Sequence, residues 1–149
     1  MSELVVDVRA RTGAFALDAR FTARPGVTVL FGPTASGKTL TLRLVAGVDR
    51  VASGSIRFGD VTFEGGGAFV PARARGLGWA PQDAALWPHR TAMAHLLPFA
   101  SDARAREVLA LVGLEAHAAR KPARLSGGER QRLAFGRALA RKPSLLLLD

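Results

Sequence analysis

Residues 27–48 read VTVLFGPTASGKTLTLRLVAGV, and this stretch decides the fold. The apolar run 27–31 predicts a strand, and Leu40 to Val48 place apolar residues at helical spacing. Between them, residues 32–39 match the pattern G-x-x-x-x-G-K-(S/T) of a phosphate-binding loop. A strand, a glycine loop and a helix in this order predict an α/β fold that binds a nucleotide where the helix begins.

The chemistry expected of this loop follows from its residue types. Glycines let the backbone amide groups turn toward phosphate oxygens, and the helix adds the positive end of its dipole. Lys38 is expected to reach the β- and γ-phosphates, and Thr39 to place its hydroxyl on Mg²⁺. The simpler alternative is a glycine turn that caps a helix, with Lys38 solvated. The loop residues predicted to bind a nucleotide, ATP or GTP, are Gly32, Pro33, Thr34, Ala35, Ser36, Gly37, Lys38, Thr39 and Leu40.

Strand patterns surround the loop in the first half of the chain. Alternating apolar residues from Leu4 to Val8 and from Phe15 to Phe21 predict two N-terminal antiparallel strands. Shorter strands are predicted at 54–58, 61–63 and 76–80. Residues 1–82 are therefore expected to form the core that carries the phosphate-binding loop.

The second half of the chain is predicted to be mainly helical. Residues from Asp83 to about Leu125 are interpreted as a helical subdomain inserted into the α/β core. A helix from about Gly127 to Arg141 follows, and then the apolar run 145–148 before Asp149. Four consecutive leucines suit a strand that is covered on both faces of a parallel sheet. Residues 126–149 are thus expected to contribute one helix and one strand.

Composition excludes several classes of protein. The chain has 149 residues, 48% of them hydrophobic, which is enough for one globular domain, and it contains no cysteine for a disulfide or a thiolate metal site. No secretory signal is expected, and no apolar run reaches the roughly 20 residues of a membrane-spanning helix. The net charge of +9 comes mostly from arginines scattered among alanines, so a solvated surface is expected and no nucleic-acid partner.

Residues 125–132 read LSGGERQR and resemble the signature sequence of the ATP-binding-cassette (ABC) ATPases. In that family Ser126, Gly127 and Gly128 would contact the γ-phosphate of an ATP held by a partner subunit. A capping box explains Ser126 and Glu129 equally well. It does not explain two adjacent glycines, each of which costs up to about 1 kcal/mol in a helix relative to alanine.

Two shorter motifs stand in the order that the same family has. Ala80-Pro81-Gln82 resembles the Q-loop, and Leu145 to Asp149 resembles the Walker B strand, although each alone would also fit a strand that ends in a surface turn. By this resemblance Gln82 contacts Mg²⁺ or the attacking water and senses a membrane subunit, while Asp149 holds Mg²⁺. The implied metal residues are Thr39, Gln82 and Asp149, and the implied catalytic residues are Lys38, Gln82 and Ser126.

The chain departs from the family pattern in two places. The general base, a glutamate directly after the Walker B aspartate, would follow Asp149, so the resemblance implies that a C-terminal part is missing and that this piece alone is inactive. The family stacks adenine on an aromatic residue near Arg9 to Thr12, where this chain has none. Phe15 is the nearest candidate, but its period with Leu17 and Phe21 favours a place in the core.

Residues 71–89 are similar to the importer members of the family, above all to the molybdate importer ATPases; sulfate, iron and polyamine importers share much of the pattern. The resemblance implies a homodimer that sandwiches two ATP molecules, splits ATP to ADP and phosphate, and drives import at the cytoplasmic face of the membrane. The implied partners are a permease subunit and, indirectly, a solute-binding protein. Trp87, Pro88 and His89 would pack either on the permease or on their own subdomain. A non-transport ABC ATPase is the alternative, but the short segment between Gln82 and Leu125 favours a transporter.

Overall fold

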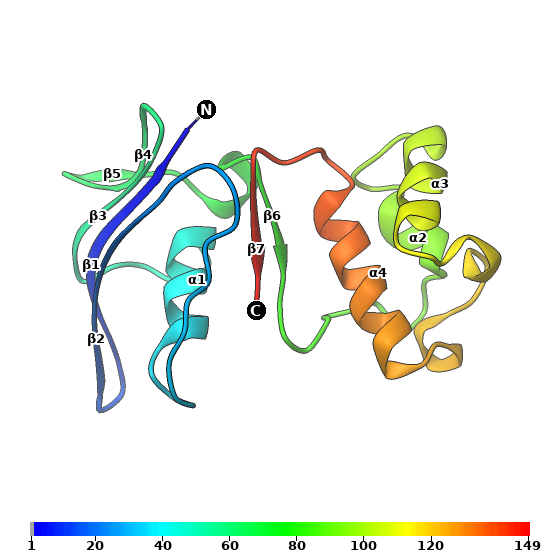
Figure 1. The fold of residues 1–149 in the computed structure, drawn as a ribbon, viewed down its shortest axis with the longest axis horizontal. Helices are drawn as coiled ribbons and strands as arrows, with labels where there is room; N and C mark the ends of the chain where they lie inside the picture. Colours follow the sequence, from blue (N-terminus) through cyan, green and yellow to red (C-terminus); the bar gives the residue numbers. More distant parts are fainter. Residues whose placement is uncertain (1) are drawn as a thin grey trace. The chain divides into compact units, whose positions relative to one another are not determined.

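A computed structural model describes residues 2–149, and two units are distinguished along the chain, one ending at Arg75 and the other beginning at Gly76 (Figure 1). The strand that leads to Gln82 thus belongs to the second unit, whereas the sequence interpretation grouped residues 1–82 together. Within residues 2–149, no helix has both the length and the apolar character needed to cross a bilayer.

The first unit contains the expected antiparallel sheet. Its strands are β1 (Leu4–Thr12), β2 (Phe15–Ala23), β3 (Ser53–Phe58), β4 (Val61–Gly65) and β5 (Ala68–Phe69), in the order β2-β1-β3-β4-β5. Every second residue of β1 is buried, namely Leu4, Val6, Val8 and Ala10. This alternation of buried and more exposed residues is the one expected for a sheet with a single packed face, so the prediction of antiparallel N-terminal strands is confirmed.

Helix α1 (Lys38–Ala46) lies beside this sheet and begins two residues earlier than the periodicity indicates (Figure 1). The strand expected at 27–31 is wrong: these residues belong to neither sheet of the described chain. Val27, Val29 and Phe31 are 95%, 77% and 99% exposed. A strand needs a neighbour to accept and donate its backbone hydrogen bonds, and an apolar sequence does not supply one.

The second unit combines a two-stranded parallel sheet with helices. Strands β6 (Leu77–Ala80) and β7 (Leu145–Leu148) pair in parallel, and the helices are α2 (Ala92–Leu96), α3 (Asp102–Leu111) and α4 (Gly127–Leu139). Short 3₁₀ turns lie at Ala72–Ala74 in the first unit and at Glu115–His117 and Pro122–Arg124 in the second. The expected helical segment from Asp83 begins only at Ala92, because residues 83–91 form a loop.

The helical core of the second unit is apolar and closely packed. It is built from buried side chains of α2, α3, α4 and their connections, among them Leu96, Val108, Leu109, Leu114 and Leu133. Helix α4 also packs on β6, where a Cβ added to Gly78 would collide with the carbonyl oxygen of Ala138. Glycine at position 78 therefore lets the helix approach the strand backbone directly.

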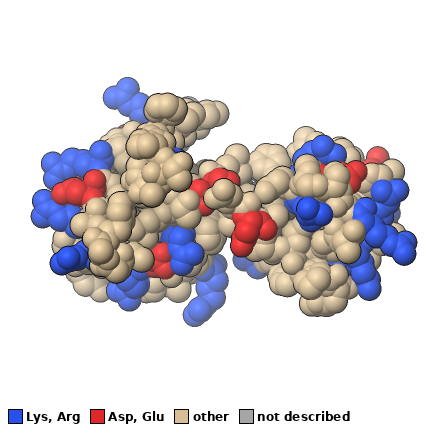
Figure 2. All heavy atoms as spheres, turned by 90° about the horizontal axis from the view of Figure 1, so that it is seen from below, with Lys and Arg blue, Asp and Glu red and all other residues tan. Residues whose placement is uncertain are grey.

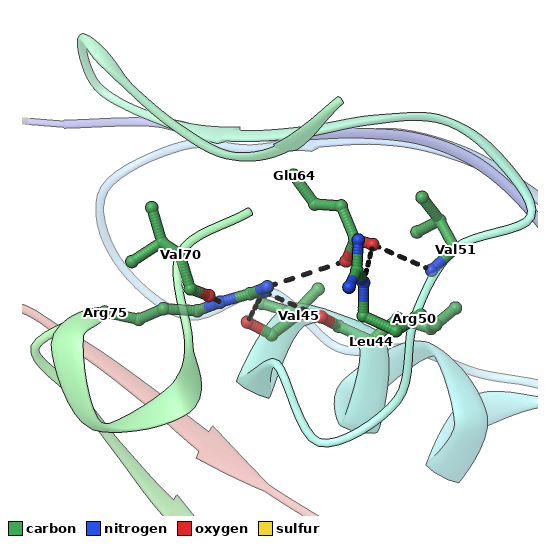
Figure 3. Close-up of polar contacts among 7 residues, drawn as sticks. All are labelled: Leu44, Val45, Arg50, Val51, Glu64, Val70 and Arg75. Atoms are coloured by element: carbon green, nitrogen blue, oxygen red, sulfur yellow. Dashed lines mark hydrogen bonds and ion pairs between the residues drawn. The ribbon is translucent and has the colours of Figure 1, made fainter. Parts of the chain in front are cut away.

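One buried guanidinium holds the C-terminal end of α1 in the first unit (Figure 3). Arg75 donates from Nη1 to the carbonyl oxygens of Leu44 and Val45, each at 2.8 Å, and from Nε to that of Val70 at 2.8 Å. Its side chain is fully buried. The last carbonyls of a helix have no partner inside the helix and carry the negative end of its dipole, so a cation stabilises them.

Glu64 of β4 supplies the countercharge to Arg75. Its Oε2 lies 3.6 Å from Nη2 of Arg75, and its Oε1 accepts hydrogen bonds from Nε of Arg50 at 2.7 Å and from the amide of Val51 at 3.2 Å (Figure 3). Burial lowers the pKa of the Arg75 guanidinium, and the carboxylate of Glu64 opposes that shift. The pair thus joins the sheet to the helix that follows the phosphate-binding loop.

We expect Arg75→Met to lower the free energy of unfolding of the full-length protein by about 3–5 kcal/mol, because three backbone carbonyls lose their donor and the carboxylate of Glu64 keeps only Arg50 as a cationic partner. The midpoint of urea unfolding measures this effect. Arg73→Met, at an exposed position two residues away, is the control and should change little. A loss below about 1 kcal/mol for Arg75→Met would contradict the role given to the pair.

Candidate functional site

The phosphate-binding loop of residues 32–39 closes around the ammonium group of Lys38. Its Nζ donates to the carbonyl oxygens of Gly32 at 2.9 Å and Pro33 at 2.7 Å, and lies 3.5 Å from Oγ of Ser36. The lysine is thereby held over the loop at the first residue of α1. A cation at a helix N-terminus, among turned backbone amide groups, is suited to bind an anion such as a phosphate.

Gly37 precedes α1 with φ +92°, a conformation that an L side chain rarely adopts. An added Cβ would also lie 2.8 Å from Cδ1 of Leu17 and 3.2 Å from the ring of Phe15. Both neighbours come from β2, so this strand packs against the end of the loop. Leu17 is buried, but Phe15 is 39% exposed, which corrects the expectation that Phe15 belongs to the core.

The signature segment begins α4 with a complete capping box. Oγ of Ser126 accepts from the amide of Glu129 at 3.3 Å, and the carboxylate of Glu129 accepts from the amide of Ser126 at 2.6 Å. The other carboxylate oxygen of Glu129 lies 3.0 Å from Nε2 of His117. These contacts, the backbone hydrogen bond first, lower the pKa of the Glu129 carboxyl.

The capping box does not account for Gly127 and Gly128. Neither glycine has a positive φ, a Cβ at Gly127 would come no closer than 3.9 Å to Arg130, and one at Gly128 would meet nothing within 4 Å. Internal packing within residues 2–149 therefore tolerates a side chain at both positions. The open space beside the α-carbons of both glycines leaves room for a ligand or a partner to approach the backbone.

Gln82 and Asp149 lie at the same edge of the parallel sheet of the second unit. Ala80 ends β6 and pairs with Leu148 of β7, and the amide of Asp149 donates to the carbonyl oxygen of Ala80 at 3.1 Å. Gln82 follows two residues later and is exposed, as is Asp149. In parallel sheets this carboxyl edge is where ligands bind.

The candidate metal residues offer oxygen donors only: the hydroxyl of Thr39, the amide of Gln82 and the carboxylate of Asp149. Residues 2–149 contain no group of three or more His, Cys, Asp or Glu side chains able to hold a metal by themselves. Mg²⁺ suits this set, because it is usually bound by one or two carboxylates together with phosphate oxygens and water. The donor set thus fits a metal that arrives with a nucleotide.

Sequence reasoning did not find the side chains that hold the segment after Gln82. Gln131 of α4 donates to the carbonyl oxygen of Gln82 at 2.7 Å, and Arg137 of the same helix donates to those of Ala84 and Ala85. Trp87 stacks on His95 with ring centroids 5.2 Å apart, so it packs on its own helical subdomain. The sequence analysis placed both residues in the predicted helix from about Gly127 to Arg141 and assigned neither a partner.

Charged side chains of both signs are interspersed on the face drawn in Figure 2. On the face drawn in Figure 2, lysines and arginines appear in separate patches with acidic groups and uncharged surface between them. Several arginines are paired, for example Arg9 with Asp18 and Arg106 with Asp102. Exposed ion pairs of this kind are typical of a solvated surface.

Comparison with known proteins connects these features. The family model described as "ABC transporter" matches residues 17–149. The chain is 43% identical over 155 residues to the molybdenum import ATP-binding protein ModC of Rhizobium etli, covering 98% of this chain and 44% of that protein. It is 44% identical over 158 residues to ModC of Brucella abortus, covering 100% of this chain and 44% of that protein.

A solved structure shares the fold. The dimeric post-hydrolysis state of the ATP-binding cassette MJ0796, bound to ADP and phosphate, superposes with a TM-score of 0.75 at 25% identity. The match covers 100% of this chain and 73% of that one. Against the two curated relatives, the chain spans 44% of their length.

Proposed function

This chain belongs to the ABC transporter family, and we propose that it is part of an ATP-hydrolysing subunit that drives uptake of molybdate or a similar oxyanion. The names of the relatives, molybdenum import ATP-binding proteins, support the solute. Since the chain spans 44% of their length, the activity, solute and partners are proposed for the whole protein.

The observation that carries this proposal is the start of helix α4. Ser126 and Glu129 cap the helix, yet Gly127 and Gly128 have no internal reason to be glycine. Two open amide groups at the positive end of a helix suit a phosphate. We therefore assign Ser126, Gly127 and Gly128 to the γ-phosphate of an ATP held by a second copy of the chain.

The remaining roles follow from the chemistry of each group. Lys38 binds the β- and γ-phosphates at the start of α1, and the rest of residues 32–40 surrounds them. Thr39, Gln82 and Asp149 would hold Mg²⁺, which neutralises charge that develops on the transferred phosphoryl group. Gln82 is also proposed to orient the attacking water. We assign Lys38, Thr39, Gln82 and Asp149 to the same nucleotide.

Phe15 is proposed to bind the adenine ring. Its ring lies beside Gly37 of the loop, and the residue is 39% exposed, so part of its surface is accessible next to the predicted phosphate site. Aromatic side chains stack on bases irrespective of base identity. Phe15 then takes the part that the family gives to an aromatic residue slightly earlier in the chain.

The proposed assembly is a homodimer bound to a permease subunit at the cytoplasmic face of the membrane. A solute-binding protein on the other side would deliver the oxyanion to that permease. The dimeric structure of the similar MJ0796 cassette supports the proposed dimer.

Lys38→Ala should abolish Mg-ATP binding by the full-length protein and, in cells, ATP-driven molybdate uptake, because the ammonium group at the β- and γ-phosphates is lost. Equilibrium titration with a fluorescent ATP analogue measures the first effect and molybdenum accumulation the second. Lys121→Ala, which removes an exposed lysine, should change neither. Unchanged ATP affinity in Lys38→Ala would contradict the loop assignment, and molybdate uptake that persists would contradict the solute.

Ser126→Ala should leave ATP binding to one copy intact and reduce kcat for hydrolysis, because the hydroxyl acts on the nucleotide of the partner copy. The substitution also removes a helix cap, at a cost of about 1 kcal/mol. Ser101→Ala is the matched control, since Ser101 caps α3 through the same kind of bond to the amide of Arg104. Equal turnover in the two variants would argue against the sandwich dimer.

Phe15→Ala should weaken ATP binding by about 5- to 150-fold, the loss expected when one base–aromatic stack worth about 1–3 kcal/mol is removed. Phe15→Trp preserves a stacking face and should bind ATP nearly as well as the parent protein. Titrating each full-length variant with ATP and with inorganic triphosphate separates the base from the phosphates. Affinity for triphosphate should not change, and equal losses for both ligands would show that Phe15 acts through the loop.

A further inference from the structure

The loop that follows Gln82 has a strained backbone. Ala84 and Ala85 have φ values of 59° and 42°, in the left-handed region that side chains other than glycine rarely adopt. Ala84 is buried, and its amide donates to the carbonyl oxygen of Pro81 at 3.0 Å. Such a conformation persists only where surrounding contacts hold it, and strain of this kind gathers at functional sites.

The contacts that hold this turn come from α4, the helix that begins with the signature segment. Arg137 donates from Nη1 to the carbonyl oxygen of Ala85 at 2.7 Å and from Nη2 to that of Ala84 at 3.0 Å. Gln131 donates to the carbonyl oxygen of Gln82 at 2.7 Å. The strained turn and the backbone of Gln82 are thus bonded to one helix.

The far end of the loop is fixed as well. The amide of Trp87 donates to Nε2 of His95 at 2.8 Å, while Nδ1 of His95 lies 2.7 Å from the carbonyl oxygen of Thr91. Nε2 must accept and Nδ1 must donate, so His95 is the neutral Nδ1–H tautomer. The guanidinium of Arg137 lies 5.4 Å from the centre of the Trp87 ring and so contacts this end of the loop too.

The geometry of Arg137 suits an arginine better than a lysine. Two terminal nitrogens of its planar group reach the carbonyls of two consecutive residues, whereas a lysine would have to reach both from one nitrogen on a shorter side chain. Burial lowers the pKa of the Arg137 guanidinium, and the carboxylate of Asp83 opposes that shift. Among the described residues, the hydrogen bonds of the Arg137 guanidinium go to backbone carbonyls and not to a carboxylate.

We propose that Arg137 is a positioning residue that locks the strained turn Ala84–Ala85 to the signature helix, so that Gln82 and the N-terminus of α4 are placed as one rigid body. This proposal rests on the proposed function, because it assigns Gln82 and Ser126 to nucleotide chemistry. A displacement of the loop would move the signature helix with it, through hydrogen bonds rather than through the apolar core. Arg137 itself does not touch the nucleotide.

The test compares Arg137→Lys with Arg104→Lys in the full-length protein. Arg104 also donates to a backbone carbonyl of the α4 end, that of Leu139 at 3.3 Å, but does not contact the loop. For Arg137→Lys we expect kcat for ATP hydrolysis to fall about tenfold, as for loss of one charge-assisted hydrogen bond, while the Kd for ATP stays within about twofold. Hydrogen exchange at the amides of residues 84–87 should accelerate in Arg137→Lys only.

A second substitution tests whether Arg137 acts by stabilising the strained backbone of Ala84 and Ala85. Ala85 is exposed, and glycine adopts a positive φ at little cost, so Ala85→Gly should stabilise the turn without creating a cavity. Added to Arg137→Lys, it should restore part of the lost kcat and slow the exchange of residues 84–87. Rescue by this exposed substitution is not expected if Arg137 merely supports the helical core.

Unchanged exchange at residues 84–87 in Arg137→Lys would overturn the proposal, as would an equal loss of kcat in Arg104→Lys. A parent protein that does not hydrolyse ATP would contradict the proposed function. Hydrogen exchange at residues 84–87 is measured without nucleotide. It therefore tests the role of Arg137 even if the parent protein does not hydrolyse ATP.

Discussion

The close approach of α4 to β6 is the constraint on which the second unit depends. Because no side chain fits at Gly78, the helix lies directly against the strand backbone. The same helix buries Leu133 and Ala134 in the core and reaches the loop after β6 with Gln131 and Arg137. One packing contact thereby fixes the sheet edge that carries Gln82 and the helix that carries the signature segment.

In the first unit, a buried ion pair holds helix α1 in place. Helix α1 must keep its N-terminus available to an anion while its C-terminus is buried near the sheet. Arg75 satisfies the C-terminal carbonyls of Leu44 and Val45, and Glu64 balances the guanidinium (Figure 3). The two units thus use different means, a buried ion pair and a glycine contact, to hold a helix whose first residues are proposed to bind phosphate.

Local patterns predicted those features of the fold that depend on neighbouring residues. The antiparallel strands, the helix after residue 37, the capping box at Ser126 and the leucine strand at 145–148 could be anticipated from spacing and residue type. The prediction of a strand at 27–31 was wrong, because a strand forms only where a neighbouring strand pairs with its backbone, and apolar composition does not reveal that neighbour. Arg75 and Arg137 could not be assigned, since their partners are backbone carbonyls 30–31 and 52–53 positions away. Phe15 and Leu17 both fit the alternating apolar pattern of β2. The pattern cannot show that Phe15 is partly exposed whereas Leu17 is buried.

The assignment of the start of α4 to the terminal phosphate of an ATP bound to a second copy of the chain can be tested by sedimentation velocity. The full-length protein is measured with Mg²⁺ and either a slowly hydrolysed ATP analogue or ADP. We expect a dimer with the triphosphate and a monomer with ADP, because only the triphosphate offers a γ-phosphate to Ser126 and the adjacent amides. The same sedimentation coefficient with both nucleotides would contradict it.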